Sequence, residues 1–226
     1  GFFRQDQIKV MTDRLQHRGP DSGGEFHDGP CSLGHRRLSI IDLSTRASQP
    51  MYSANDRYVI VYNGEVYNYR EIGARFGKIT QGTSDFAFKS SSDTEVLLEA
   101  FAKYGPDFVQ ELNGMFAFAI YDRSQNELYL YRDRLGIKPL YYYWDGKNFA
   151  FASELKSLTS LEQIPLEINH AATMHTAKMP KVTTATEAKV RGARVKNALL
   201  MCCPKPQPMT SWAANKPSLG KRPANP

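Results

Sequence analysis

An asparagine followed by a glycine lies inside an apolar run between Val59 and Tyr69, and this pair could take part in catalysis. The side-chain amide of Asn63 and the backbone N–H of Gly64 could both point at one spot, as the donors of an oxyanion hole do in acyl transfer. Glycine at position 64 would let the backbone approach a substrate closely. An Asn-Gly pair between apolar segments is also the strongest short-range signal for a β-hairpin turn. The pair by itself leaves both interpretations open.

The histidines and cysteines do not suggest a metal site. The spacings of four such residues match no zinc-ligand signature: His17, His27, Cys31 and His35. The remaining cysteines, Cys202 and Cys203, are adjacent, which fits neither a CxxC motif nor a disulfide framework. We therefore expect no metal and a reducing, cytoplasmic location. No apolar run approaches the roughly eighteen residues of a membrane span, so no membrane partner is expected.

Upstream of the Asn-Gly pair, the sequence predicts a helix and strands. Residues 8–15 have one apolar face at helical spacing. Gly and Pro in residues 17–24 predict a loop, and residues 31–42 are typical of a pair of strands. Three residues of this segment are expected in the core: Leu38, Ile40 and Ile41. Residues 70–90 are polar and predict a short helix, a loop and a short strand.

Downstream, Ser92-Asp93-Thr94-Glu95 has the pattern of a capping box at the start of a helix that Gly105-Pro106 ends. The buried stripe of this helix is predicted from its apolar spacing: Leu97, Leu98, Phe101 and Tyr104. Four strands and a final short helix are expected after it, over residues 115–121, 127–131, 140–144, 149–152 and 155–158. Consecutive antiparallel strands with inserted helices predict an α+β fold with stacked sheets.

The net charge of +6 is unevenly distributed. Residues 173–226 hold ten lysines and arginines against the single Glu187, whereas residues 1–172 carry three more acidic than basic side chains. The basic segment also holds seven of the thirteen prolines and no apolar period, so it is expected to be disordered. It lacks interleaved aromatic side chains, so no nucleic-acid partner is expected.

Six motifs then occur in order along the chain. They are His17-Arg18-Gly19-Pro20-Asp21, Arg37-Leu38-Ser39-Ile40, Asn63-Gly64-Glu65, Ser92-Asp93-Thr94-Glu95, Arg132-Asp133-Arg134-Leu135-Gly136-Ile137-Lys138-Pro139-Leu140 and Ala152-Ser153-Glu154-Leu155-Lys156. Together, over residues 1–172, they resemble the class II glutamine amidotransferase domain, an N-terminal-nucleophile hydrolase. The set is most similar to the glutaminase half of glutamine-hydrolysing asparagine synthetase.

This resemblance implies a four-layer αββα sandwich of stacked, mostly antiparallel sheets over residues 1–160, with the site between two sheets. Residues 161–172 would link it to a C-terminal synthetase domain that the sequence does not contain. In the family, the glutaminase releases ammonia from glutamine, and the synthetase domain uses ATP and magnesium to activate aspartate for amidation. No cofactor is implied for the glutaminase domain itself, and a homodimer stays open.

The resemblance also implies roles for individual residues. Asn63 and Gly64 match the oxyanion hole, Arg37 matches the arginine that pairs with the glutamine α-carboxylate, and Asp93 and Glu65 match the groups that hold the α-ammonium. Three neighbours of Arg37 join the expected glutamine-binding set: Leu38, Ile40 and Ile41. His17 and Arg18 are expected to organise the loop at the edge of the site. Arg132-Asp133 and Lys138-Pro139 are interpreted as a structural turn near the surface.

The sequence departs from the family pattern at both ends. The family begins with a cysteine whose thiol attacks glutamine, whereas this sequence begins at Gly1. Cys31 lies inside the chain and has no free α-amino group, so it is not expected to replace that cysteine. We expect these residues alone to bind glutamine poorly and to hydrolyse none of it, and a non-catalytic binding module is the alternative. The resemblance stops at Thr173, and a shift of reading frame there is a hypothesis for the basic segment.

Overall fold

The computed structural model describes residues 3–38, 45–76, 88–165 and 188–190. Its elements follow one another along the chain with these bounds: α1 Gln7–Asp13, β1 Ser22–Asp28, β2 Cys31–Arg37, η1 Thr45–Ala47, β3 Met51–Tyr52, β4 Tyr58–Val66, α2 Tyr69–Ala74, α3 Asp93–Tyr104, η2 Pro106–Glu111, β5 Gly114–Asp122, β6 Glu127–Arg132, β7 Tyr141–Trp144, β8 Phe149–Ala152, α4 Leu155–Leu158 and β9 Ala188–Val190. No helix within these ranges is long and apolar enough to cross a membrane.

A five-stranded antiparallel sheet in the order β3-β4-β5-β6-β9 forms the centre of the fold. β4 pairs with β5 along its whole length, from Tyr58 opposite Asp122 to Val66 opposite Gly114. Because successive side chains of a strand point to opposite faces, β4 contributes Ile60 to one buried cluster and Val61 to another. Both faces of this sheet are therefore covered by other elements.

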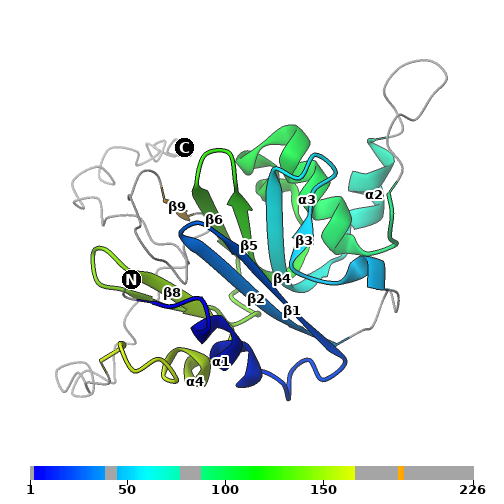
Figure 1. Cartoon of the computed structure of the whole chain (residues 1–226). Coiled ribbons are helices and arrows are strands. Elements are labelled where there is room, and N and C mark those ends of the chain that lie inside the picture. Colours follow the sequence, from blue (N-terminus) through cyan, green and yellow to red (C-terminus); the bar gives the residue numbers. More distant parts are fainter. Residues whose placement is uncertain (1–2, 39–44, 77–87, 166–187, 191–226) are drawn as a thin grey trace, which may run out of the picture.

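Helices cover one face of the central sheet (Figure 1). α3 packs on it together with α2 and η2, through the buried side chains of Leu97, Leu98 and Phe101. The period of these residues is helical, as the sequence predicts. Tyr104, which was expected in the same stripe, is 43% exposed, because it lies at the last turn of the helix.

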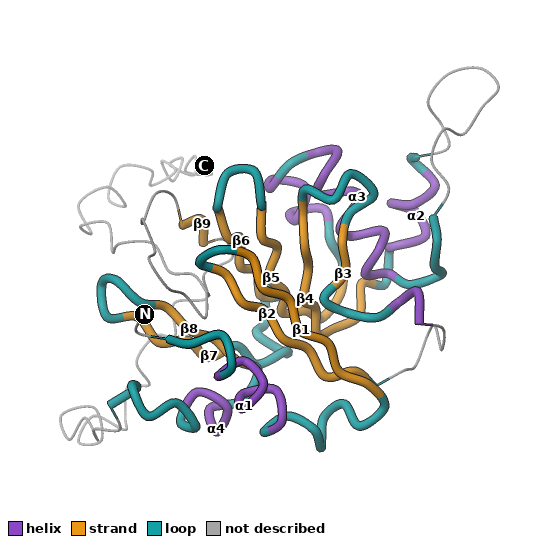
Figure 2. Tube along the Cα trace, viewed as in Figure 1, coloured by secondary structure: helices purple, strands orange, loops and turns teal. Residues whose placement is uncertain are grey.

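Two hairpins cover the opposite face. Figure 2 shows β1 and β2 running across β4 and β5, and Phe26, Leu33 and Phe149 pack with the central strands in one cluster. The β7–β8 hairpin then packs against α1 and α4, with Phe3, Met11 and Leu158 in a third cluster. The α+β class and the antiparallel sheets that the sequence predicts are confirmed, and the complete four-layer sandwich stays a prediction.

The interpretation of Asn63-Gly64 as a hairpin turn is wrong. β4 runs straight through both residues, which pair with Ala117 and Phe116 of β5. A Cβ atom at position 64 would lie 2.3 Å from the carbonyl oxygen of Met115. The glycine is therefore required by the close approach of a neighbouring strand, a use of glycine that the Asn-Gly signal does not distinguish from a turn.

A second correction concerns the loop predicted over residues 17–24. β1 begins at Ser22 and includes Gly23 and Gly24, because pairing with Arg36 and His35 of β2 outweighs the low strand propensity of glycine. Leu38, expected in the core, is 55% exposed just after β2 ends. Ile40, Ile41 and the short strand expected after α2 lie outside the described residues.

The predicted N-cap of α3 is confirmed, since the Ser92 hydroxyl accepts a hydrogen bond from the Glu95 backbone N–H at 3.4 Å. The Glu95 carboxylate does not return to the Ser92 N–H. It accepts instead from the backbone N–H groups of Lys89 and Ser90, at 2.8 and 2.7 Å. The cap therefore also fixes the segment that enters the helix.

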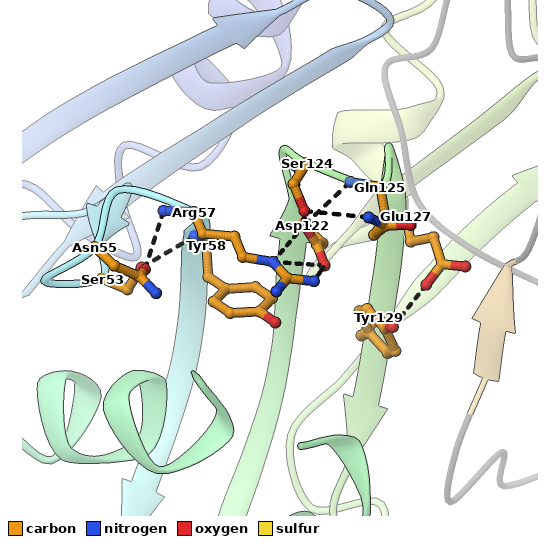
Figure 3. Close-up of polar contacts among 9 residues, drawn as sticks. All are labelled: Ser53, Asn55, Arg57, Tyr58, Asp122, Ser124, Gln125, Glu127 and Tyr129. Atoms are coloured by element: carbon orange, nitrogen blue, oxygen red, sulfur yellow. Dashed lines mark hydrogen bonds and ion pairs between the residues drawn. The ribbon is translucent and has the colours of Figure 1, made fainter. Parts of the chain in front are cut away.

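The turns at the far end of β4 and β5 are joined by the buried carboxylate of Asp122 (Figure 3). It accepts hydrogen bonds from Arg57, the closest at 2.6 Å, and from the backbone N–H groups of Ser124 and Gln125. Burial alone would raise the pKa of Asp122, but these donors outweigh it and lower the pKa. This network closes the end of β4 that lies farthest from Asn63 and Gly64.

Two segments that follow the predicted domain of residues 1–160 also pack or pair with it. Leu161 and Ile164, in the predicted linker, are buried in the cluster with α1 and α4. Residues 188–190 belong to the segment that was expected to be disordered, and they pair as β9 with Leu128–Leu130 of β6. The other residues of the basic segment lie outside the described ranges, so its disorder stays a prediction.

Candidate functional site

The final third of β4 brings together the residues with predicted chemical roles. Asn63 and Glu65 are exposed, Gly64 is half-buried, and Val66 is fully buried. Since strand side chains alternate, Asn63 and Glu65 point to the face on which Val59 and Val61 contact the β1–β2 hairpin. Their side chains therefore lie at the edge of the space between the two sheets.

The backbone N–H of Gly64 points to the open edge of β4. In an antiparallel pair, every second residue directs its N–H and C=O away from the paired strand. Tyr62 does so, because its N–H donates to Gln49 Oε1 at 2.6 Å, and Val66 does so, because its N–H donates to Asp93 Oδ2 at 3.0 Å. Gly64 lies between them with the same orientation, so its N–H faces this edge and does not pair with β5.

Asp93 connects α3 to this edge. It is the first residue of the helix and is 4% exposed. Its Oδ2 atom accepts from the Tyr62 hydroxyl at 2.7 Å as well as from the Val66 N–H. Burial, followed by the charge of Asp93, raises the pKa of Tyr62. The structure therefore brings Asp93 to the strand that carries Asn63 and Gly64, thirty positions earlier.

Arg37 is the last residue of β2 and is half-buried. Its carbonyl accepts from the Asp21 N–H at 3.1 Å, which ties the end of β2 to the loop before β1. Arg36 points the other way, as expected from strand alternation, and its guanidinium pairs with Asp13 of α1. Leu38 follows on the surface, while Ile40 and Ile41 of the predicted glutamine-binding set lie outside the described residues.

His17 and Arg18 are tied to the N-terminus of α4. The carboxylate of Glu154 forms ion pairs with Arg18 and with Lys156, the latter at 3.1 Å, and one of its oxygens lies 3.0 Å from His17 Nε2. The hydrogen bond from Arg18 contributes most to lowering the pKa of Glu154, to about 2. These contacts tie the loop to α4 and assign a partner to Glu154, whose motif carried no role in the sequence. The organising role expected for His17 and Arg18 at the site stays a prediction.

The turn around Arg132 and Asp133, interpreted from the sequence as a structural turn near the surface, is held by hydrogen bonds to backbone groups. Asp133 is 3% exposed. Its carboxylate accepts four backbone N–H groups: those of Phe116, Leu135, Ile137 and Lys138. Arg132 donates to the carbonyls of Gly136 and Lys138 at 2.7 and 2.8 Å. The turn is structural, as predicted, but buried hydrogen bonds maintain it.

Sequence reasoning missed two residues at the edge of β4. His35 Nε2 lies 3.0 Å from the Tyr62 carbonyl oxygen, and Gln49 binds the Tyr62 N–H. His35 was considered only as a zinc ligand, and Gln49 was given no role. Neither residue belongs to a local pattern, because the contact joins positions 35, 49 and 62.

Other features of the described residues do not add to the site. Cys31 is completely buried, and burial raises the pKa of its thiol well above the ordinary value, so it is a poor nucleophile. No three histidine, cysteine or acidic side chains in the described ranges gather as metal ligands would. A hollow of about 260 Å³ lies beside β3 and α3, between Arg46, Lys89 and Glu99, and none of the predicted glutamine-binding residues lines it.

The chain belongs to the glutamine amidotransferase domain family, whose model matches residues 3–199. The match extends past residue 172, to which the resemblance based on the motifs was limited. The structure is similar to that of the glutamine phosphoribosylpyrophosphate amidotransferase from B. subtilis, with a TM-score of 0.57 and 20% identity, over 70% of this chain and 41% of that one. At this identity the likeness shows the fold, which is that of the amidotransferase domain.

Within the family, the chain is related to glutamine-hydrolysing asparagine synthetases. It is 41% identical over 178 residues to a putative asparagine synthetase of Methanocaldococcus jannaschii, covering 71% of this chain and 33% of the relative. It is 41% identical over 169 residues to asparagine synthetase 1 of Bacillus subtilis, covering 75% and 26%. Asparagine synthetase B of Escherichia coli is 39% identical over 149 residues, covering 66% and 26%. The chain thus spans a third or less of these relatives.

Proposed function

We propose that this chain is the glutaminase part of a glutamine-hydrolysing asparagine synthetase, and that it binds glutamine at the open edge of β4. The observation that carries the proposal is the orientation of the Gly64 N–H, which faces this edge between two amides that Gln49 and Asp93 bind. The family match and the identity of about 40% to asparagine synthetases support the choice of substrate.

In this proposal, Asn63 and Gly64 donate hydrogen bonds to the carbonyl oxygen of the glutamine side chain. The oxygen gains negative charge in the transition state, and each such donor contributes about 3 kcal/mol to its stabilisation. The guanidinium of Arg37 binds the α-carboxylate with two parallel hydrogen bonds, which a lysine cannot reproduce. Glu65 and Asp93 supply negative charge for the α-ammonium.

The attacking thiol of the proposed reaction is an N-terminal cysteine, as in the family the sequence resembles. The printed residues begin at Gly1, and Cys31 is too deeply buried to act instead. We extend the proposal to the larger relatives: ammonia would amidate aspartate at a synthetase domain that uses ATP and magnesium. No described residue of this chain is assigned to those cofactors. The αββα sandwich and a cytoplasmic location complete the proposal.

Binding of L-glutamine by isothermal titration calorimetry tests the proposal directly, because binding requires no nucleophile. We expect weak but saturable binding that Arg37→Lys weakens about tenfold further, since one of two parallel charge-assisted bonds is lost. Arg36→Lys is the matched control, because Arg36 is on the same strand and binds Asp13 on the opposite face. Equal affinities of the two variants, or no binding by the unmodified chain, would contradict the proposal.

A further inference from the structure

The backbone N–H and C=O of Tyr62 lie in the part of β4 that extends beyond its pairing with β3. β3 is two residues long and pairs only with Val59 and Ile60. Beyond them, the edge of β4 has no partner strand among the described elements, and buried backbone groups without partners would be costly. The Tyr62 N–H and C=O are nevertheless satisfied by two side chains, Gln49 and His35, that come from different segments.

Gln49 reaches the strand because glycine in β1 leaves room for it. A Cβ atom at position 24 would lie 2.3 Å from the Gln49 carbonyl oxygen, so the backbone of Gln49 packs directly against β1. From there its Oε1 accepts the Tyr62 N–H at 2.6 Å, and its Nε2 lies 3.5 Å from the Thr94 hydroxyl of α3. Gln49 thus contacts both elements that frame the predicted site.

His35 binds the backbone carbonyl of Tyr62. A carbonyl oxygen can only accept, so His35 Nε2 carries the hydrogen and donates it to Tyr62 across 3.0 Å. The other ring nitrogen, Nδ1, is buried and has no hydrogen-bond partner in the described part of the chain. His35 is paired with Gly24 in the β1–β2 hairpin and lies two residues before Arg37. The side chain therefore crosses from the hairpin to the edge of β4.

We propose that His35 and Gln49 are positioning residues that fix the Tyr62 peptide edge and thereby aim Asn63 and Gly64 at glutamine. This inference rests on the proposed function. The two side chains hold the residue directly before the predicted oxyanion donors, and Asp93 holds Val66, two residues after Gly64. A displacement of about 1 Å in such donors is enough to reduce their effect greatly. Neither His35 nor Gln49 touches the substrate in this arrangement.

The test compares His35→Leu, which removes the donor, with His35→Gln, which keeps an N–H donor on a side chain of similar length. His27→Leu is the control, because His27 is in the same hairpin and its ring contacts only that hairpin among the described residues, at Ser32 across 2.9 Å and at Glu25 across 3.7 Å. The first readout is amide hydrogen exchange over residues 62–66. We expect about tenfold faster exchange there in His35→Leu, near-normal exchange in His35→Gln, and no change in His27→Leu.

The second readout is the dissociation constant for L-glutamine in the same four proteins. We expect His35→Leu to bind about tenfold more weakly and His35→Gln to recover most of the affinity. Exchange over residues 62–66 that is the same in His35→Leu and His27→Leu would overturn the inference, as would faster exchange with unchanged glutamine affinity. If the unmodified chain binds no glutamine, the proposed function fails, while the exchange data still decide whether His35 fixes this edge.

Discussion

Acidification should destabilise this fold through His35. Burial lowers the pKa of His35 from 6.5 to about 4, and the charge of Arg37 acts in the same direction, whereas the hydrogen bond to Tyr62 opposes the shift only in part. The unfolded chain therefore takes up a proton on this residue before the folded chain does. Stability from this source is complete above pH 6.5, decreases as the pH falls towards 4, and changes no further below that.

The size of the effect follows from the two pKa values. At pH 5 the unfolded state is almost fully protonated at His35 and the folded state is almost fully neutral. One pKa unit corresponds to about 1.4 kcal/mol, so the pH interval from 6.5 to 5 costs about 2 kcal/mol of unfolding free energy. This is a large share of the total for a domain of ordinary stability.

Urea unfolding at pH 7 and pH 5 measures the effect, with His35→Gln as the partner variant because glutamine does not titrate. The expected result is that the unmodified chain loses about 2 kcal/mol more than His35→Gln between the two pH values. Other titrating groups affect both proteins equally and cancel in the difference. Equal losses in the two proteins would refute the reasoning, because they would mean that folding does not lower the pKa of His35.

Three further changes test the packing and the hydrogen bonds around the site, each by urea unfolding. Gly64→Ala should destabilise the fold by more than about 2 kcal/mol, because the new methyl group would lie 2.3 Å from the Met115 carbonyl oxygen. Gly73→Ala is the control and should be neutral or stabilising, because the atom nearest to its new methyl group would lie 3.6 Å away. Asp133→Ala should cost about 3 kcal/mol, since four backbone N–H groups lose their acceptor, and a cost below about 1 kcal/mol would contradict that role. Ser92→Ala should cost about 1 kcal/mol through loss of the N-cap of α3, whereas Ser92→Asp should retain most of the stability.

The helix α3 and strands β5 to β8 could be predicted because their signals are local. The cap at Ser92, the stop at Gly105 and the apolar period between them lie within one segment, and the structure reproduces them. The predictions were wrong where glycine stands in a strand. Gly23, Gly24 and Gly64 look like turn residues in the sequence, yet each accommodates a side chain or backbone from a distant segment.

The sequence by itself determined the family and the order of the motifs, because residue types at fixed spacing are properties of the chain alone. It also named Asn63, Gly64 and Asp93, whose roles at the site stay proposals. Only the tertiary structure decided which of their backbone groups face the open edge of β4, and which side chains bind the neighbouring backbone groups. The edge of β4 that the Gly64 N–H faces has no partner strand there among the described elements, because β3 is only two residues long. At Tyr62, His35 and Gln49 bind the backbone groups of this edge instead. Hydrogen bonds between positions so far apart depend on how sheets and hairpins pack, which no local pattern encodes.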